Sequence, residues 1–256
     1  MSFQIIIPAR YASSRLPGKP LLDIAGKSMI NHVIDNALAS QADRIILATD
    51  DDRIAEHADD SGVTICMTAL EHTSGTERIA EVINKLDIPA DTILVNLQGD
   101  EPLMPVECLN QVGAALENET QAQMATLSAR ITSATEMFDP HCVKLTVDKN
   151  NYALYFSRAA IPWHQADFAD NKQQLNQTDN CYRHIGLYAY RAKFVQQYVS
   201  WGACRLEEYE SLEQLRVLYN GYKIKVLETS VTPGPGVNTP EEFEHVTAIM
   251  LNNKKS

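Results

Sequence analysis

Long apolar runs are missing from this sequence of 256 residues. No stretch approaches the roughly 18 consecutive apolar residues that a membrane-spanning helix needs, so membrane insertion through such a helix is excluded. The N-terminus also lacks a basic segment followed by an apolar core and a cleavage site, the pattern of a secretory signal peptide. We therefore expect a cytoplasmic protein.

Cysteine and positive charge are both scarce. The five cysteines are widely spaced, at Cys66, Cys108, Cys142, Cys181 and Cys204. They show no CxxC or Cys/His ligand spacing, which argues against a zinc site and predicts reduced thiols. The 33 acidic residues outnumber the 22 lysines and arginines, and the net charge is -11. This balance argues against a nucleic-acid partner held by a broad basic face.

A glycine fingerprint for dinucleotides is also missing. No G-x-G-x-x-G turn follows the first predicted strand, which counts against a nicotinamide-dependent dehydrogenase. Apolar residues still make up 45% of the chain. This is enough to build the core of one α/β domain or of two small ones.

The most informative stretch is residues 4–27, QIIIPARYASSRLPGKPLLDIAGK. The β-branched run Ile5–Ile7 predicts a short buried strand, and the loop after it carries Arg10, Arg15 and Lys19 on a rigid Pro-Gly-Lys-Pro frame. Ligands of open α/β sheets bind beyond the carboxyl ends of the strands, where these cations could bind phosphate oxygens. We interpret the loop as a polyphosphate site, and a solvated basic loop is the alternative.

Strand and helix patterns alternate after this loop. The apolar spacing predicts a helix from about Met29 to Leu38 and a buried strand at residues 44–48. This order indicates a right-handed βαβ unit and a mostly parallel sheet. The acidic run from Asp50 to Asp52 either caps the next helix or forms a metal cluster, and we favour the cap.

A capping box precedes another predicted helix. Ser74-Gly75-Thr76-Glu77 has the required spacing, with Ser74 as the N-cap. Arg78 then places a cation in the first turn, where the helix dipole does not favour one. A surface salt bridge and a contact with a nucleotide at the helix N-terminus are both possible roles for Arg78.

The next buried strand, at residues 92–96, ends in Gln98-Gly99-Asp100-Glu101. If the strands are parallel, Asp100 faces the same crevice as the cationic loop. A carboxylate opposite a phosphate-binding loop suits magnesium, which binds few protein carboxylates and takes its other ligands from phosphate and water. The alternative for Asp100 is an ordinary turn residue.

The second half of the chain changes character. Apolar and polar residues alternate at 142–148 and at 184–190, and residues 152–158 are predicted as another strand between them. These three strands indicate an antiparallel subdomain. Leucines and a tyrosine then recur at helical spacing and predict the core stripe of one helix: Leu206, Tyr209, Leu212, Leu215 and Leu218. A second capping box at Thr239-Pro240-Glu241-Glu242 predicts a final helix.

Several motifs, in this order, resemble those of sugar-activating cytidylyltransferases, and most closely those that act on 3-deoxy-manno-octulosonate (KDO). They are IIPARYASSRLPGKPLLDIAGK, ATDDDRIA, SGTERIAEV, VNLQGDEPL, ALYFSRAAIPW, RHIGLYAYR and LEQLRVLYNG. The resemblance extends to about residue 243 and implies an α/β, Rossmann-like nucleotide-diphospho-sugar transferase fold in a single domain. It also implies a nucleotide-binding half at 1–135, an inserted sugar-binding and dimerisation subdomain at 140–195, and a return to the main sheet at 196–256.

The activity that this resemblance implies is transfer of CMP from CTP to the anomeric hydroxyl of KDO, with release of pyrophosphate, for lipopolysaccharide biosynthesis. Magnesium as cofactor and a homodimer are further expectations from the resemblance. A cytidylyltransferase for another sugar acid, such as 8-amino-KDO or sialic acid, and a non-catalytic nucleotide-sugar-binding homologue are the alternatives.

The resemblance also implies roles for single residues. Arg10, Arg15, Lys19 and Asp100 form the expected catalytic set, with Asp100 as a magnesium ligand. The expected nucleotide contacts are Ala9, Arg10, Ser13, Arg15, Lys19, Ser74 and Arg78. The expected sugar-acid contacts are Gln98, Arg158, His184, Tyr188, Glu213 and Gln214. From the residue alone His184 stays open, because a lone strand histidine is often a satisfied core residue.

One position departs from the family pattern. The family carries Gly-Val-Asp-Thr near its C-terminus, and its aspartate is expected to share the catalytic magnesium. This chain has Gly236-Val237-Asn238-Thr239. We expect Asn238 as the second metal ligand, although an amide oxygen is a weaker ligand for a hard cation. Weaker magnesium binding, another divalent ion, or greater use of Asp100 or Glu101 would each follow from this change.

Overall fold

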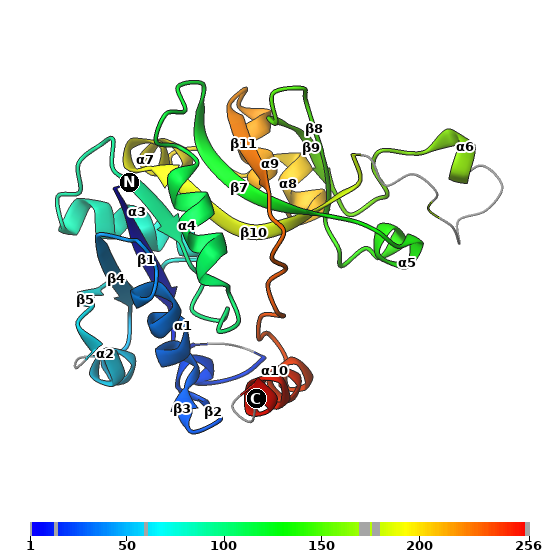
Figure 1. Cartoon of the computed structure of the whole chain (residues 1–256). Coiled ribbons are helices and arrows are strands. Elements are labelled where there is room, and N and C mark those ends of the chain that lie inside the picture. Colours follow the sequence, from blue (N-terminus) through cyan, green and yellow to red (C-terminus); the bar gives the residue numbers. More distant parts are fainter. Residues whose placement is uncertain (1, 13–14, 59–60, 169–174, 176–179, 254–256) are drawn as a thin grey trace.

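The computed structural model describes residues 2–12, 15–58, 61–168, 175 and 180–253 (Figure 1). A nine-stranded sheet forms its centre, with the order β11-β7-β10-β6-β1-β4-β5 and with β8 and β9 attached beside β10. The strands of this sheet are β1 (Phe3–Ala9), β4 (Arg44–Thr49), β5 (Thr64–Met67), β6 (Ile93–Asn96), β7 (Ala122–Arg130), β8 (Lys144–Val147), β9 (Ala153–Ser157), β10 (Tyr182–Arg191) and β11 (Lys223–Glu228). A small hairpin adds β2 (Asp23–Ile24) and β3 (Lys27–Ser28).

Helices pack on the sheet and extend beyond it. They are α1 (Met29–Leu38), α2 (Asp52–Ala58), α3 (Gly75–Lys85), α4 (Val106–Ala114), α5 (Ala134–Phe138), α6 (Gln165–Phe168), α7 (Ala192–Val199), α8 (Arg205–Glu210), α9 (Gln214–Tyr219) and α10 (Pro240–Asn253), with a 3-10 turn η1 (Lys19–Leu21). No helix in the described parts of the chain has the length and apolarity to cross a membrane.

The core has two layers because β1 is buried on both faces. Ile5 and Ile7 pack in one cluster with residues of α1 and α4, whereas Ile6 packs in a second cluster with residues of α3 and α7. The neighbours β4 and β6 both pair with β1 in parallel. A continuous apolar run is typical of a strand covered on both faces. The predicted, mostly parallel α/β sheet is therefore confirmed.

Strand β10 runs antiparallel within this sheet and leaves it at one end. Its residues 188–191 pair with β6, while Tyr182 and Arg183 pair with β8. The pairing with β7 shifts register between Ile185 and Tyr188, which marks a β-bulge, and Figure 1 shows the strand curving there. The predicted antiparallel strands thus share β10 with the main sheet, and the expected division at residues 135, 140 and 195 stays a prediction.

The predicted single helix through residues 206–218 is wrong. Ser211 adopts the left-handed conformation (φ 52°) and ends α8, and α9 begins only at Gln214. Tyr209, which we expected in the core stripe, is 78% exposed. The apolar spacing is real, but a left-handed residue breaks the helix within it. The resulting turn is important because it directs residues 211–214 toward the cavity described below.

The C-terminal helix α10 begins at the predicted capping box. The Thr239 hydroxyl accepts from the Glu242 N–H at 3.3 Å, and the Glu242 carboxylate accepts from the Thr239 N–H at 3.1 Å. Val246 of this helix packs with Ile24 of β2 and with Val237. Figure 1 shows α10 beside the β2–β3 hairpin, so the last helix lies against the first loop region of the chain.

Candidate functional site

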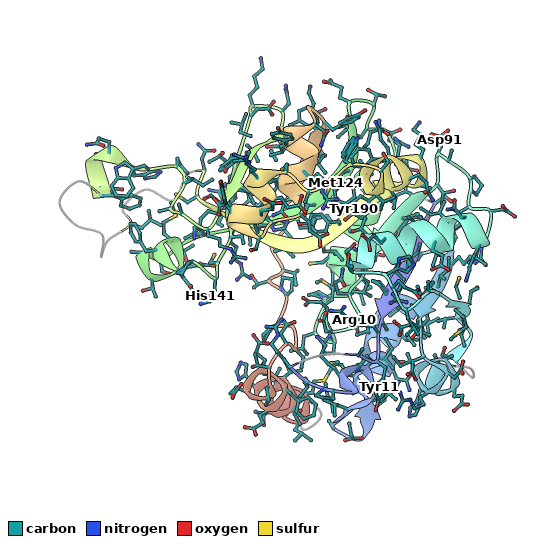
Figure 2. All side chains as sticks on the ribbon, turned by 180° about the vertical axis from the view of Figure 1, so that it is seen from behind. Arg10, Tyr11, Asp91, Met124, His141 and Tyr190 are labelled. Carbon is teal, nitrogen blue, oxygen red and sulfur yellow. The ribbon has the colours of Figure 1, made fainter. Side chains whose placement is uncertain are left out.

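A cavity of about 540 Å³ lies at the carboxyl ends of β1 and β6. Its lining comes from segments that are far apart in the sequence: residues 8–10, Arg15, Lys19, Pro20, residues 72–76, Arg78, Asn96, residues 98–101, Tyr188, Tyr190, residues 211–214 and Asn238. Figure 2 shows Arg10, which follows β1, and Tyr190 on β10, two of the elements that border this space. The cavity therefore combines the cationic loop, the β6 exit and the α8–α9 turn.

The cationic loop is held by its own backbone geometry. Gly18 adopts the left-handed conformation (φ 67°) that precedes η1, and its N–H donates to the Tyr11 carbonyl at 3.3 Å. Arg10 and Arg15 are exposed and line the cavity, together with Ala9 at the end of β1. Ser13 lies outside the described residues.

Lys19 joins the loop to two other segments. Its Nζ lies 2.5 Å from Asp100 Oδ2 and donates to the Val237 carbonyl at 2.9 Å. The Val237 N–H donates to the Asp100 carbonyl at 2.9 Å. The cation, the β6 exit and the segment before α10 thus form one connected structure at the cavity wall.

Gly99 allows the β1 and β6 exits to lie this close. A Cβ at this position would be 3.0 Å from the Pro8 carbonyl oxygen and 3.2 Å from the Ala9 Cβ. The absence of a side chain at Gly99 therefore permits the close approach of the β1 backbone. This packing aims Asp100 at the cationic loop.

Oxygen ligands for a hard cation gather beside Lys19. Asp100, Glu101 and Asn238 all line the cavity. Burial and the neighbouring Asp100 carboxylate raise the pKa of Glu101 to about 8. No cluster of three or more His, Cys, Asp or Glu side chains that could hold a metal alone occurs in the described residues. The oxygens fit a magnesium ion that takes its remaining ligands from a triphosphate and water.

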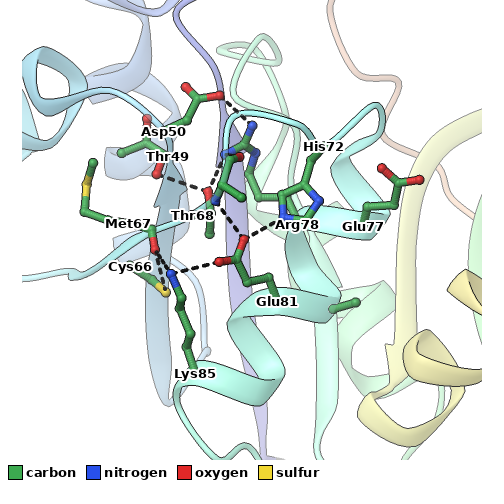
Figure 3. A network of polar contacts seen from close by, with 12 residues as sticks. Thr49, Asp50, Cys66, Met67, Thr68, His72, Glu77, Arg78, Glu81 and Lys85 are labelled. Atoms are coloured by element: carbon green, nitrogen blue, oxygen red, sulfur yellow. Dashed lines mark hydrogen bonds and ion pairs between the residues drawn. The ribbon is translucent and has the colours of Figure 1, made fainter.

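Arg78 is not a surface salt bridge. Its side chain is 3% exposed, and its Nη2 lies 2.7 Å from Oδ2 of Asp50, which is 5% exposed. Its Nη1 donates to the Thr68 hydroxyl and, at 3.4 Å, to the Ala69 carbonyl (Figure 3). Arg78 still lines the cavity, as does the N-cap Ser74, whose hydroxyl accepts from the Glu77 N–H at 3.2 Å.

The three aspartates after β4 do not form a metal cluster. Asp50 pairs with Arg78, whereas the Asp51 carboxylate accepts the Arg53 N–H at 3.0 Å and Asp52 lies in the first turn of α2. The helix-capping interpretation is therefore confirmed, with Asp51 as the residue that caps.

A second set of charges holds the cavity wall before α3. Glu81 accepts from His72 at 2.5 Å, from Lys85 at 2.8 Å and from the Ala69 N–H at 2.8 Å (Figure 3). Burial opposes ionisation of this carboxyl, but the hydrogen bonds from Lys85, the Ala69 N–H and His72 lower its pKa to about 2. His72 lines the cavity, and this carboxylate fixes its ring there.

Polar side chains from β6, β10 and α9 form the other end of the cavity. Gln98 donates to the Asn96 side chain at 3.1 Å, and Tyr188 and Tyr190 lie beside them on the lining. Glu213 also lines the cavity. Desolvation, together with the nearby Glu207 carboxylate, raises the pKa of Glu213.

Gln214 carries a buried donor without a partner. The residue is 4% exposed, and its Nε2 has no hydrogen-bond partner among the described residues. A buried amide donor that is left unsatisfied costs about 1–3 kcal/mol. Because Gln214 lines the cavity, a ligand acceptor there could satisfy this donor.

Two of the expected sugar contacts lie outside this lining. Arg158 donates from Nε to the Glu210 carbonyl at 2.7 Å and from Nη1 to the Pro140 carbonyl at 3.0 Å. His184 lies 3.0 Å from the Thr126 hydroxyl, its ring packs on Phe156, and desolvation lowers its pKa to about 3. The structure thus shows His184 as a satisfied histidine, and a sugar-binding role for either residue stays a prediction.

Several residues of the cavity lining were not predicted from the sequence. Tyr190 could have been found, because it shares a strand face with Tyr188 at a spacing of two residues. His72 lies two positions before the N-cap Ser74, a place that carries no recognisable signal. Ser211 and Leu212 were assigned to the interior of a helix that is in fact broken there.

Comparison with known proteins places this geometry in a family context. A sequence model of the family described as cytidylyltransferase matches residues 4–224. The chain is 52% identical over 249 residues to a protein of Idiomarina loihiensis called 3-deoxy-manno-octulosonate cytidylyltransferase, covering 97% of this chain and 98% of the relative. A protein of the same name from Haemophilus influenzae is 51% identical over 255 residues, covering 99% and 100%.

Solved structures show the same similarity. A structure of CMP:2-keto-3-deoxy-manno-octonic acid synthetase complexed with CTP superposes with a TM-score of 0.87 at 40% sequence identity. The superposition covers 98% of this chain and 99% of the other.

Proposed function

This chain belongs to the cytidylyltransferase family, and from that premise we propose that it transfers CMP from CTP to the anomeric hydroxyl of KDO and releases pyrophosphate. The observation that carries the proposal is the cavity itself. It combines the cations Arg10, Arg15 and Lys19 with the carboxylate of Asp100 at the carboxyl edge of the sheet. The similarity over nearly the whole chain to relatives named for this sugar acid supports the choice of substrate.

The cationic loop holds the triphosphate. Arg10, Arg15 and Lys19 bind its oxygens and neutralise the charge that develops on the leaving pyrophosphate. The ammonium group of Lys19 has three N–H donors. Two of them donate to Asp100 and to the Val237 carbonyl, so the third can donate to a phosphate oxygen. Ser74 and Arg78, at the start of α3, contact the cytidine part.

The sugar acid lies at the other end of the cavity. Gln98, Tyr188, Glu213 and Gln214 line it there, and the free Nε2 donor of Gln214 supports a polar ligand at this place. Arg158 and His184 remain in the proposal as contacts that the family resemblance alone supports. The sugar's anomeric oxygen forms a bond to the α-phosphorus, the bond from that phosphorus to the β-phosphate oxygen breaks, and the hydroxyl proton is released.

Asp100 and Asn238 would hold a magnesium ion, with Glu101 beside them. When bound, such an ion supplies charge neutralisation at the phosphates and lowers the pKa of the attacking hydroxyl. The protein contributes orientation: it holds the hydroxyl and the α-phosphate in line, which removes much of the entropic barrier.

The cellular setting is also part of the proposal. We place the enzyme in the cytoplasm, in lipopolysaccharide biosynthesis, as a homodimer. None of the five cysteines, all of which are within the described residues, forms a disulfide, and this suits a reducing compartment. The dimer rests on the family resemblance.

Pyrophosphate release tests the proposal. The reaction contains the chain, CTP, magnesium and KDO, with ATP, UTP and GTP as nucleotide controls and with sialic acid and 8-amino-KDO as sugar controls. We expect release that depends on both CTP and KDO. Faster turnover of another sugar acid would change the substrate, and CTP binding without turnover of any of these acids would indicate a non-catalytic homologue.

A further inference from the structure

We propose that Asp50 is a positioning residue for nucleotide recognition: it fixes the Arg78 guanidinium at the cavity wall and so makes the site prefer CTP over UTP. The inference rests on the proposed use of CTP. Asp50 is not one of the residues that line the cavity, and it acts on the cavity through its ion pair with the lining residue Arg78.

Two neighbouring strand ends hold the guanidinium. Asp50 follows β4 and accepts from Nη2 at 2.7 Å, while Thr68 and Ala69 follow β5 and accept from Nη1. Thr68 is itself fixed to the end of β4, because its N–H and its hydroxyl donate to the Thr49 carbonyl at 2.8 and 3.1 Å. Figure 3 shows these groups gathered around the Arg78 side chain. The guanidinium therefore has one defined position.

That position leaves donors for a ligand. A guanidinium has five N–H groups and no acceptor. The hydrogen bonds within the described residues use Nη1 and one N–H of Nη2, and Nε has no partner among them. Arg78 lines the cavity. Its unused N–H groups can therefore be offered to a ligand in the cavity.

The chemistry of the base explains the preference. Cytosine presents acceptors at both O2 and N3, whereas uracil carries a hydrogen on N3 and presents a donor there. A rigidly held group that can only donate matches the cytosine edge and opposes the uracil edge. A guanidinium free to rotate would lose much of this discrimination, because it could turn its donors to other acceptors.

A role in ligand binding would also explain why the Asp50–Arg78 ion pair is buried. Taking two charges out of water costs several kcal/mol per ion, and a pair of apolar residues is often as stable. Arg78 also lies in the first turn of α3, where the helix dipole disfavours a cation. The pair is thus weakly explained by stability. Fixing the arginine before the ligand arrives reduces the entropy lost on binding.

The experiment compares two nucleotides in the absence of sugar acid. Dissociation constants for CTP and UTP are measured by calorimetry on the full chain and on the variants Asp50→Asn, Asp50→Glu, Arg78→Met and Asp50→Asn/Arg78→Met. We expect Asp50→Asn to weaken CTP binding by about ten- to hundredfold, the range of a charged hydrogen bond, with a much smaller effect on UTP. The double variant should bind CTP no more weakly than Arg78→Met alone.

Asp50→Glu separates position from charge. It keeps the negative charge beside Arg78 and so avoids an uncompensated buried cation, which makes it the variant to use if Asp50→Asn does not fold. Its longer side chain displaces the guanidinium, and we expect the CTP/UTP ratio to fall with it. An unchanged ratio in Asp50→Glu, or an additional loss in the double variant beyond that of Arg78→Met, would overturn the inference.

Another ion pair supplies the matched control. Glu207 and Arg216 form a pair at 2.5 Å with side chains 9% and 16% exposed, and neither residue lines the cavity. Glu207→Gln should lower the melting temperature and leave the CTP/UTP ratio unchanged. In turnover, the Asp50 variants should raise KM for CTP more than they lower kcat.

The two proposals can fail separately. If no sugar acid supports pyrophosphate release but the CTP/UTP ratio still depends on Asp50, the nucleotide inference stands and the proposed reaction is wrong. If pyrophosphate release occurs as proposed and the CTP/UTP ratio is the same in the Asp50 variants as in the natural chain, the proposed reaction stands and the positioning role is wrong.

Discussion

The Nζ of Lys19 lies 2.5 Å from Oδ2 of Asp100, although the two residues are 81 positions apart in the chain. The pair is partly buried, with side chains 14% and 27% exposed. It joins the cation that we assign to phosphate with the carboxylate that we assign to magnesium. Each side chain therefore holds the other in the cavity before substrate binds.

Removing the ammonium group of Lys19 should strongly lower the rate of the chemical step. We expect Lys19→Met to lower kcat for pyrophosphate release by about 100- to 1000-fold, the usual loss when one group that stabilises transition-state charge is removed. Lys19→Arg keeps the charge and should recover part of the rate. The matched control is Lys27→Met, which removes a more exposed lysine paired with Asp35 on the hairpin side of the molecule. Native kcat in Lys19→Met would contradict the assignment.

The amide at position 238 should weaken magnesium binding. Asn238 stands where the resembled family carries aspartate, and it lines the cavity with Asp100. We expect Asn238→Asp to lower the magnesium concentration for half-maximal rate, because a carboxylate is the stronger ligand for this ion. A magnesium titration of both forms at fixed CTP measures the effect, and manganese provides a parallel titration. Superimposable titration curves would rule out a metal-binding role for this position.

The unpaired donor of Gln214 predicts that one substitution will increase stability and weaken sugar-acid binding. Gln214→Leu removes a buried group that lacks a partner, so we expect the free energy of unfolding to rise by roughly 1 kcal/mol. The same change removes a proposed sugar contact, so KM for the sugar acid should rise roughly three- to tenfold while CTP affinity is kept.

A second glutamine provides the control for Gln214. Gln123 on β7 also has a buried side-chain atom, Oε1, without a partner among the described residues, and it does not line the cavity. Gln123→Leu should therefore stabilise the chain without any change in KM. A Gln214→Leu variant with native KM for the sugar acid would remove this residue from the site.

Local patterns predicted the parts of the site that depend on strand ends. The apolar run Ile5–Ile7 and the buried strand at 92–96 were found from hydrophobicity alone, and their carboxyl ends meet because they pair in parallel. The cationic loop and Asp100 could therefore be placed together before the fold was known. The capping boxes at Ser74 and Thr239 could also be predicted from the sequence, because both ends of each motif lie within four residues.

Features that depend on distant partners could not be predicted. Nothing in the sequence marks Ser211 as left-handed, because the leucine spacing continues across the break. The partner of Arg78 is Asp50, which the local pattern assigned to a helix cap. The bulge in β10 is likewise invisible in its alternation, so the absence of His184 from the cavity lining could not be foreseen.

The environment of His184 predicts a pH dependence of stability. Its pKa falls to about 3 in the folded chain, against about 6.5 in an unfolded one, because the ring is desolvated beside Phe156 and Thr126. Above pH 6.5 the ring is neutral in both states and contributes nothing. Below that pH only the unfolded chain takes up the proton, so stability falls by about 1.4 kcal/mol for each pH unit until the folded pKa is reached.

His184→Gln should remove this part of the pH dependence, because glutamine can still hydrogen-bond to the Thr126 hydroxyl and does not titrate. Between pH 7 and pH 5 we expect the free energy of unfolding, measured with urea, to fall by about 2 kcal/mol more in the natural chain than in the variant. His141→Gln removes an exposed histidine and should reproduce the natural profile. Parallel profiles for the natural chain and His184→Gln would mean that the ring accepts a proton in the folded state, as a histidine bound to a sugar carboxylate would need to do.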